Sequence, residues 1–194
     1  MHFNRSQLTQ VVLLTIMVLL VTVSFMHAPG QGDIASWERW ANDSDTLGLV
    51  DGFTAIKADY PPFSSVILFV AIRAAHLFGI GPFGAAKLAI LLGLCLTSLV
   101  FWIWTKNFLL ALVVHLSLLL NSVVLGYIDV FFAPSLLLAL WALKQQKLTW
   151  FAVFYSITCL TKWQPILIAP FFALALLNIK HIKQWKQIHF KKLI

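Results

Sequence analysis

Seven apolar segments dominate this chain of 194 residues and limit the folds that it can adopt. Hydrophobic residues make up 60% of the sequence and the mean hydropathy is +0.88, both far above the values of a soluble domain. Several segments approach the roughly 20 residues that a helix needs to cross a bilayer. We therefore predict an all-α, polytopic membrane protein. The segments are residues 8–27, 63–78, 85–104, 108–126, 130–143, 148–161 and 165–179.

The acidic residues are concentrated between the first two segments. Residues 28–62 hold all the acidic residues except Asp129, which points to chemistry by a carboxylate at a membrane surface. A short helix over residues 33–41 is expected to lie flat in the headgroup layer, because Trp37 and Trp40 favour that environment. The acids without motif context are expected to be solvated: Glu38, Asp43, Asp45 and Asp51.

The basic residues predict the topology, because cytoplasmic loops carry an excess of Lys and Arg. If all seven segments cross the membrane, Lys144, Lys147 and the basic tail emerge outside, against this rule. Segment 63–78 is short and carries Arg73 and His76, so we expect it to lie in the outer interface instead. Nine of the 14 basic residues then become cytoplasmic: Arg5, Lys106, Lys144, Lys147, Lys180, Lys183, Lys186, Lys191 and Lys192.

The predicted organisation is one membrane domain over residues 1–194 with about six transmembrane helices and both termini in the cytoplasm. It comprises a first span at 8–27, an external loop with interfacial helices at 28–84, five further spans within 85–179, and a basic cytoplasmic tail at 180–194. A cleaved signal peptide is the rival interpretation of 8–27, but the apolar stretch is too long for one. The net charge of +7 fits topology and anionic lipid, so no nucleic-acid partner is expected.

The last three spans are short. About 14 residues rise roughly 21 Å, against a hydrocarbon core of about 30 Å. Lysines and tryptophans hold their cytoplasmic ends, so their outer ends at Asp129 and at residues 161–165 are expected below the outer surface. Polar connections at that depth must line a cavity or be buried in protein. This predicts a cavity floored by Asp129 and Lys162 and roofed by the acidic loop.

Two acidic motifs in the first loop carry candidate chemistry. Asp33 follows Gly32 and lies close to Trp37, so it is a candidate general base; the alternatives are a solvated acid or a helix N-cap. Asp59 and Tyr60 precede Pro61-Pro62, which stiffen the chain and set a helix start. A rigid helix entry without a binding role is the alternative here.

Ionisable residues between apolar spans are costly and are therefore functional candidates. Asp129 and Lys162 form either a structural ion pair or an anion site, in which Gln164 and the helix start at Pro165 supply further donors. Arg73 either faces water and headgroups or contacts a phosphate. His115 is explained by hydrogen bonds between helices.

These motifs resemble those of a known enzyme class. Gly32-Asp33 with Trp37 and Arg39-Trp40, then Asp59-Tyr60-Pro61-Pro62-Phe63, Gly126-Tyr127-Ile128-Asp129 and Thr161-Lys162, appear in the order found in membrane glycosyltransferases of the GT-C class. The likeness covers about residues 5–190 and is greatest to dolichyl-phosphate-glucose-dependent glucosyltransferases and to bacterial aminoarabinose and mannosyl transferase relatives. Asp-Tyr-Pro-Pro is the more specific motif.

The resemblance implies inverting transfer of a sugar from a polyprenyl-phosphate donor to a glycan or lipid acceptor hydroxyl, with Asp33 as the catalytic base and no divalent metal or other cofactor. It implies an integral protein of the bacterial plasma membrane, in contact with membrane lipids, whose active face is extracytoplasmic. The substrate-binding residues are expected to be Trp37, Asp59, Tyr60, Arg73, Asp129, Lys162 and Gln164.

Enzymes of this class continue with further spans, so we expect a truncated product, a fragment, or half of a split enzyme completed by a second polypeptide. The alternative function is a non-catalytic component that binds lipid-linked sugar, or a part of a transporter or flippase.

Overall fold

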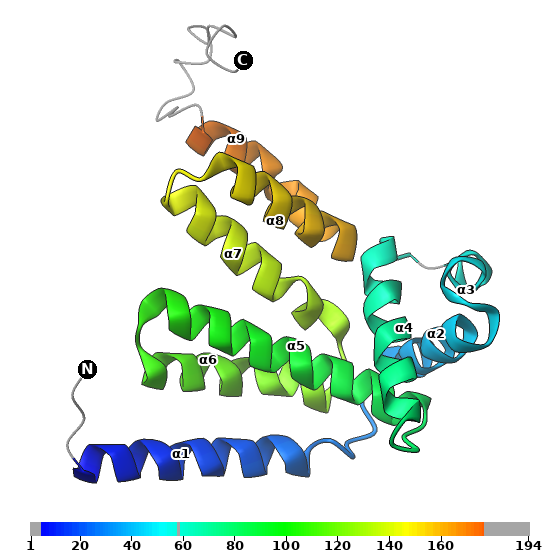
Figure 1. Cartoon of the computed structure of the whole chain (residues 1–194), viewed down its shortest axis with the longest axis horizontal. Helices are drawn as coiled ribbons and strands as arrows, with labels where there is room; N and C mark the ends of the chain where they lie inside the picture. Colours follow the sequence, from blue (N-terminus) through cyan, green and yellow to red (C-terminus); the bar gives the residue numbers. More distant parts are fainter. Residues whose placement is uncertain (1–4, 58, 177–194) are drawn as a thin grey trace, which may run out of the picture. The chain divides into compact units, whose positions relative to one another are not determined.

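The computed structural model describes residues 5–57 and 59–176, and helices dominate them (Figure 1). No strand occurs in these two ranges, so the all-α prediction is confirmed. The chain forms two compact units, Met1–Lys162 and Trp163–Ile194, which are described separately below. Residues 177–179 of the last predicted span and the predicted tail at 180–194 lie outside the described residues.

The first unit contains a helical hairpin of α5 (Pro82–Thr105) and α6 (Phe108–Leu119), with α1 (Arg5–Ser24) beside α6 (Figure 1). Lys106 adopts a left-handed conformation at the turn, and the side chain of Asn107 accepts a hydrogen bond from the Leu110 amide. This N-cap starts α6 immediately after α5 ends. α6 continues into one wide turn of π-helix, η1 (Leu120–Val124).

A second hairpin is formed by α7 (Ala133–Lys144) and α8 (Leu148–Thr161), which follow the 3-10 turn η2 (Ile128–Phe131). Thr158 Oγ1 donates a hydrogen bond to Ser135 Oγ between the two helices, at 2.9 Å. α7 also packs on α5, so the two hairpins are joined. We refer to α1, α5, α6, α7 and α8 as the helical body.

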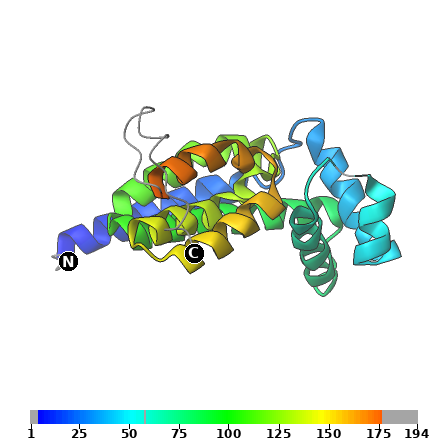
Figure 2. The same ribbon diagram turned by 90° about the horizontal axis from the view of Figure 1, so that it is seen from above.

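Residues 28–84, the first loop, fold into α2 (Asp33–Leu47), α3 (Leu49–Ile56) and α4 (Pro62–His76). α4 runs across the direction of α5 in both views of the ribbon (Figures 1 and 2). α2 packs against α4 and α5, and α4 also contacts α8. The first loop is therefore a folded helical layer at the end of the body where α5 begins.

The second unit begins with the 3-10 turn η3 (Gln164–Ile168) and continues as α9 (Ala169–Leu176). Pro165 and Pro170 lie at the starts of these two elements, where a missing amide hydrogen costs little.

Each predicted segment is mainly helical where the structure describes it, although several bounds differ and residues 25–27, 77–78, 125–126 and 132 lie in turns. α8 has the predicted bounds, whereas α5 begins three residues before residue 85, because Pro82 is a favourable first helical residue. The prediction that the helix from Asp33 ends at residue 41 is wrong. α2 continues to Leu47 because the next helix-breaking residue is Gly48, which has a φ of +85°.

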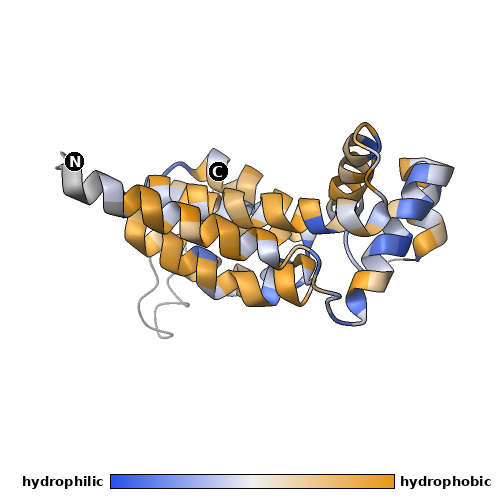
Figure 3. Cartoon of the chain, turned by 90° about the horizontal axis from the view of Figure 1, so that it is seen from below, coloured by the Kyte–Doolittle hydropathy of each residue, from blue (hydrophilic) through white to orange (hydrophobic). Residues whose placement is uncertain are grey.

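Among the described helices, α5 alone combines enough length and hydropathy to cross a membrane. Shorter apolar helical stretches, of 10 to 17 residues, are Val11–Ser24 within α1, Pro62–His76, Phe108–Val124, Leu148–Thr161 and Gln164–Leu176. Hydrophobic residues cover much of the body, and hydrophilic ones gather on the first loop (Figure 3). The number of membrane spans therefore remains a prediction.

Candidate functional site

The first loop is attached to the body at the end of α6 and η1. The backbone amide of Gln31 donates to the Leu125 carbonyl at 2.8 Å, and the indole N–H of Trp37 donates to the Gly126 carbonyl, also at 2.8 Å. The last carbonyls of a helix have no partners within it, so the loop satisfies groups that would otherwise be orphaned. These bonds fix α2 and therefore the Asp33 backbone.

Two glycines allow this close approach. Gly30 and Gly126 have φ values of +74° and +81°, which L side chains rarely adopt. A Cβ atom added to Gly126 would lie 3.2 Å from the Ile34 Cβ, and one on Gly30 would lie 3.1 Å from the Leu125 carbonyl oxygen. The glycine of Gly126-Tyr127-Ile128-Asp129 thus ends a helix and also contacts the first loop.

An aromatic cluster lies beside this contact. The rings of Trp37, Trp40 and Tyr60 meet edge-to-face, with centroids separated by 4.9 Å, 5.2 Å and 5.8 Å. Trp37 and Trp40 are only 4% and 6% exposed. Their rings are therefore buried in protein, and the expectation that their helix lies flat in the headgroup layer stays a prediction. Their apolar faces pack against each other and α4, and the polar edge of Trp37 has a partner within the protein.

Lys162 lies next to this cluster, immediately after α8. It is 8% exposed, and its ammonium group forms an ion pair with the carboxylate of Asp129. The ammonium nitrogen also lies 5.3 Å from the centroid of the Tyr60 ring, a cation–π distance. The structure thus contains the Asp129–Lys162 pair that was one of the two alternatives, and it adds Tyr60 to that pair.

Asp33 lies one helical turn before Trp37, whose ring contacts Tyr60, and its charge acts on both Tyr60 and Lys162. Burial raises the pKa of the Tyr60 phenol, and the negative charges of Asp33 and Asp59 raise it further. Burial lowers the pKa of the Lys162 ammonium, and the charge of Asp33 partly offsets this. Asp33 itself is exposed at the start of α2. An exposed carboxylate therefore lies near a buried cation, which is a suitable arrangement for a base beside an anion site.

Four elements or connections contribute to this group of residues. Asp33 and Trp37 come from α2, Asp59 and Tyr60 from the connection before α4, Asp129 from η2, and Lys162 from the end of α8. The structure thus brings together six of the predicted site residues. Gln164, the remaining residue of the predicted anion site, begins η3 in the second unit.

Arg73 lies away from the Asp33–Lys162 group and is bound by Asp45. Its guanidinium pairs with the Asp45 carboxylate at 2.9 Å and donates to the Asp45 carbonyl oxygen, also at 2.9 Å. The same carboxylate lies 3.4 Å from His76 Nδ1. Arg73 lies eleven residues along α4 from Pro62, about 16 Å from the end that carries Tyr60. The expectation that Asp45 is merely solvated is wrong, because it links the end of α2 to the end of α4.

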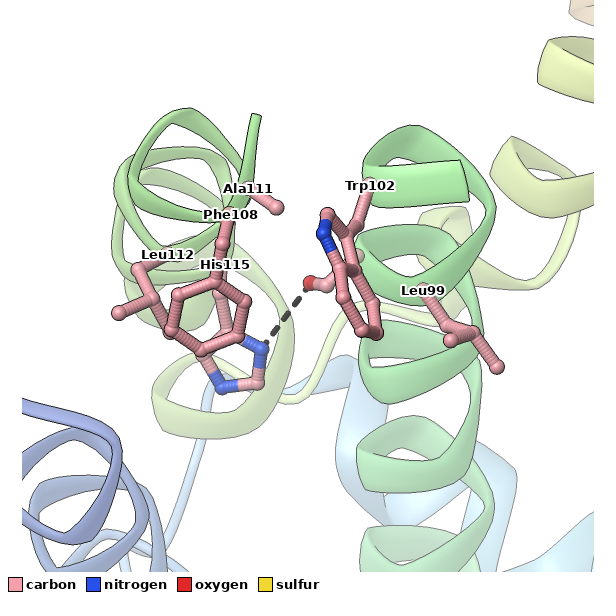
Figure 4. A pocket seen from close by; sticks show the side chains of 7 residues that line it. Leu99, Trp102, Phe108, Ala111, Leu112 and His115 are labelled. Atoms are coloured by element: carbon pink, nitrogen blue, oxygen red, sulfur yellow. Dashed lines mark hydrogen bonds between the residues drawn. The ribbon is translucent and has the colours of Figure 1, made fainter. Parts of the chain in front are cut away.

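His115 makes the predicted contacts between helices. Its ring nitrogens lie 3.1 Å from Thr22 Oγ1 on α1 and 3.0 Å from Ser98 Oγ on α5. It borders a mainly apolar cavity of about 160 Å³ between α5 and α6 (Figure 4). Trp102 in its wall is 15 residues along α5 from Lys87, about 22 Å towards the α5–α6 turn. The cavity is therefore separate from the Asp33–Lys162 group.

One buried cation was missed in the sequence interpretation, which placed lysines at the ends of apolar segments. Lys87 is 0% exposed and lies within α5, where its ammonium group donates to the Val123 carbonyl. Its position one turn into an apolar segment was the available signal.

Within residues 5–57 and 59–176, no three His, Cys, Asp or Glu side chains are grouped so that they could hold a metal ion. In comparisons with family models, with curated proteins and with solved structures, nothing matched this chain.

Proposed function

We propose that this chain is the catalytic module of a membrane glycosyltransferase that uses a polyprenyl-phosphate sugar as its donor. The observation that carries the proposal is the convergence of Asp33, Asp129, Lys162 and Tyr60 from distant parts of the sequence. A general base and a cation are the two charges that this reaction needs.

The exposure of the body supports a membrane location. A helix that is hydrophobic on all sides is either buried in protein or surrounded by lipid. Only 28% of the most apolar part of α5 is buried, so protein covers little of it. Lipid is the medium in which the remaining apolar surface is stable, and six spans with both termini in the cytoplasm remain the proposed topology.

In the proposed reaction, the acceptor hydroxyl oxygen attacks the anomeric carbon of the sugar from the side opposite the phosphate. The bond from that carbon to the phosphate oxygen breaks, and its electron pair leaves with the polyprenyl phosphate. Asp33 takes the hydroxyl proton. Because a phosphate leaves as a stable anion, no second carboxylic acid is needed to protonate it, unlike in glycoside hydrolysis.

Lys162 is proposed to stabilise the charge that develops on the departing phosphate. Asp129 holds the ammonium in position until the donor arrives, and Tyr60 covers one side of it. Asp59 and Trp37 then border the sugar. Arg73 is not part of this proposal, because Asp45 already engages its guanidinium group at the other end of α4.

The proposal is tested with the full chain in lipid nanodiscs, incubated with a panel of labelled polyprenyl-phosphate sugars. Asp33→Asn should abolish transfer and leave donor binding near normal, because the amide cannot accept the proton. Asp51→Asn is the matched control, since Asp51 is an exposed acid on the neighbouring helix α3. Retained turnover in Asp33→Asn would exclude Asp33 as the base.

Lys162→Ala should weaken donor binding by about tenfold or more, as expected for loss of a charge-assisted hydrogen bond. Unchanged donor binding would remove Lys162 from the site.

The Asp129–Lys162 pair, in which the ammonium group is buried, also fits the alternative function, a component that binds or moves lipid-linked sugar without catalysis. Donor binding by the wild-type chain without transfer, across the whole panel, would favour that alternative.

A further inference from the structure

The structure points to Lys87 as a positioning residue for the proposed site. We infer that its buried ammonium group holds the segment from Gly126 to Asp129, and through Asp129 it holds Lys162, in register with Asp33. The importance of Lys87 for catalysis rests on the proposed function. The contacts by which it holds the segment from Gly126 to Asp129 are independent of that function.

The environment of Lys87 is unusual for a charged group. The side chain has no exposed surface, and among the described residues no carboxylate pairs with it. Its contacts are the Val123 carbonyl and the ring of Phe83, whose centroid lies 5.6 Å away one turn earlier on α5. Burying a cation without a counter-ion is costly. A residue needed only for packing at this position would be apolar.

The Val123 carbonyl explains what the cation does. It belongs to the π-helical turn η1, near the negative end of the α6–η1 dipole, where carbonyl groups lack partners within the helix. Three carbonyls at this end receive donors from other elements: Val123 from Lys87, Leu125 from the Gln31 amide, and Gly126 from the Trp37 indole. Lys87 is the donor from the body, and the other two come from the first loop.

This end of the helix leads directly into the site. Gly126 turns the chain with a φ of +81°, and Asp129 follows three residues later on η2. Gly93 of α5 lies against η2, since a Cβ atom on Gly93 would be 3.2 Å from the side chain of Val130. α5 therefore fixes both sides of this connection, with Lys87 before it and Gly93 beside it.

The first test needs no ligand. The full chain is labelled with 15N at the indole nitrogens, and Trp37→Phe identifies the Trp37 signal. Lys87→Met should shift or broaden that signal, because the Gly126 carbonyl loses its fixed position. Lys106→Met, at the exposed position directly after α5, is the control and should leave the signal unchanged. An unchanged Trp37 signal in Lys87→Met overturns the inference.

The second test measures farnesyl phosphate binding in a double-mutant cycle. Lys87→Met and Asp129→Asn should each weaken binding about tenfold, and the double variant should lose much less than the product of the two effects. Additive losses overturn the route through Asp129. If Lys87→Met does not fold, Lys87→Gln is measured in the same way, because its shorter amide should not reach the Val123 carbonyl. Wild-type-like signal and affinity in Lys87→Gln also overturn the inference.

The two proposals fail separately. If the wild-type chain binds no farnesyl phosphate but Lys87→Met still moves the Trp37 signal, the proposed function fails and the positioning of the segment by Lys87 stands.

Discussion

Helices α2 and α5 both bury apolar residues but differ in the side chains that they expose. α2 buries Ile34 and its two tryptophans and exposes Asp33, Arg39 and Asn42, as a helix does at the surface of a water-soluble protein. α5 exposes large apolar residues such as Leu92 and buries Lys87 and Thr97. Small and polar residues between helices, with apolar ones outside, are typical of helices in lipid. The two regions are therefore suited to different solvents, and the candidate site lies where they meet.

The largest expected effect tests whether α5 is surrounded by lipid and the first loop by water. Leu92 in the middle of α5 is 67% exposed, and Val50 in the first loop is 75% exposed. Leu92→Asp should make membrane insertion less favourable by about 2.5–3.5 kcal/mol, the cost of a carboxylate near the centre of a span. Val50→Asp should change stability by less than about 0.5 kcal/mol, as usual for a water-exposed position.

Insertion efficiency of each variant into microsomal membranes measures this difference. Equal effects of the two substitutions would show that α5 and the first loop share one solvent.

The next effect concerns the contact between the two regions. Gly126→Ala forces a side chain into a left-handed backbone conformation and against Ile34. We expect a loss of about 1–3 kcal/mol, together with faster proteolysis within residues 28–84 as the first loop detaches. Gly32→Ala is the control, because its φ is negative and nothing lies within 4 Å of the added Cβ. If both variants resist unfolding and proteolysis equally, the contact at Gly126 does not hold the loop.

The smallest effect is a pH dependence. The pKa of Tyr60 in the folded chain is raised above its ordinary value of 10.0 by burial and by Asp33 and Asp59. Its contribution to stability is therefore constant below about pH 10 and decreases above it, until the pH passes the folded pKa. Tyr60→Phe should remove this part of the alkaline destabilisation.

Phenolate absorbance, compared between wild type and Tyr60→Phe, isolates the titration of Tyr60. Asp33→Asn should lower that pKa towards 10.0, and Asp51→Asn should not change it. An unaltered curve in Asp33→Asn would separate Asp33 from Tyr60.

The helices could be predicted from the sequence because apolar runs and helix-breaking residues are local signals. The bounds of α8 follow from the polar residues on either side of it, and Pro82 marks the start of α5. The end of α2 was misplaced because the polar residues after Ala41 suggested a loop, whereas tertiary packing against α3 and α4 keeps them helical.

The pairing of Asp129 with Lys162 was predictable as an alternative, since two opposite charges in an apolar context favour each other. The burial of Trp37 could not be predicted, because its hydrogen-bond partner, the Gly126 carbonyl, is 89 residues away in the chain. Asp45 and Lys87 were missed for the same reason. Each has a partner on another helix, and the spacing of residues within one helix carries no information about which faces will meet.

The π-helical turn at Leu120–Val124 has a consequence for how this chain tolerates insertions and deletions. A π-turn accommodates one residue more than the α-helix it interrupts, and one residue corresponds to a rotation of about 100° and a rise of about 1.5 Å. Because the wide turn already absorbs one extra residue, deleting one residue within it would restore a regular α-helix and leave Asp129 facing Lys162. Deleting one residue from the regular part of α6, which holds no extra residue, would instead turn everything after it by about 100° and direct Asp129 away from Lys162.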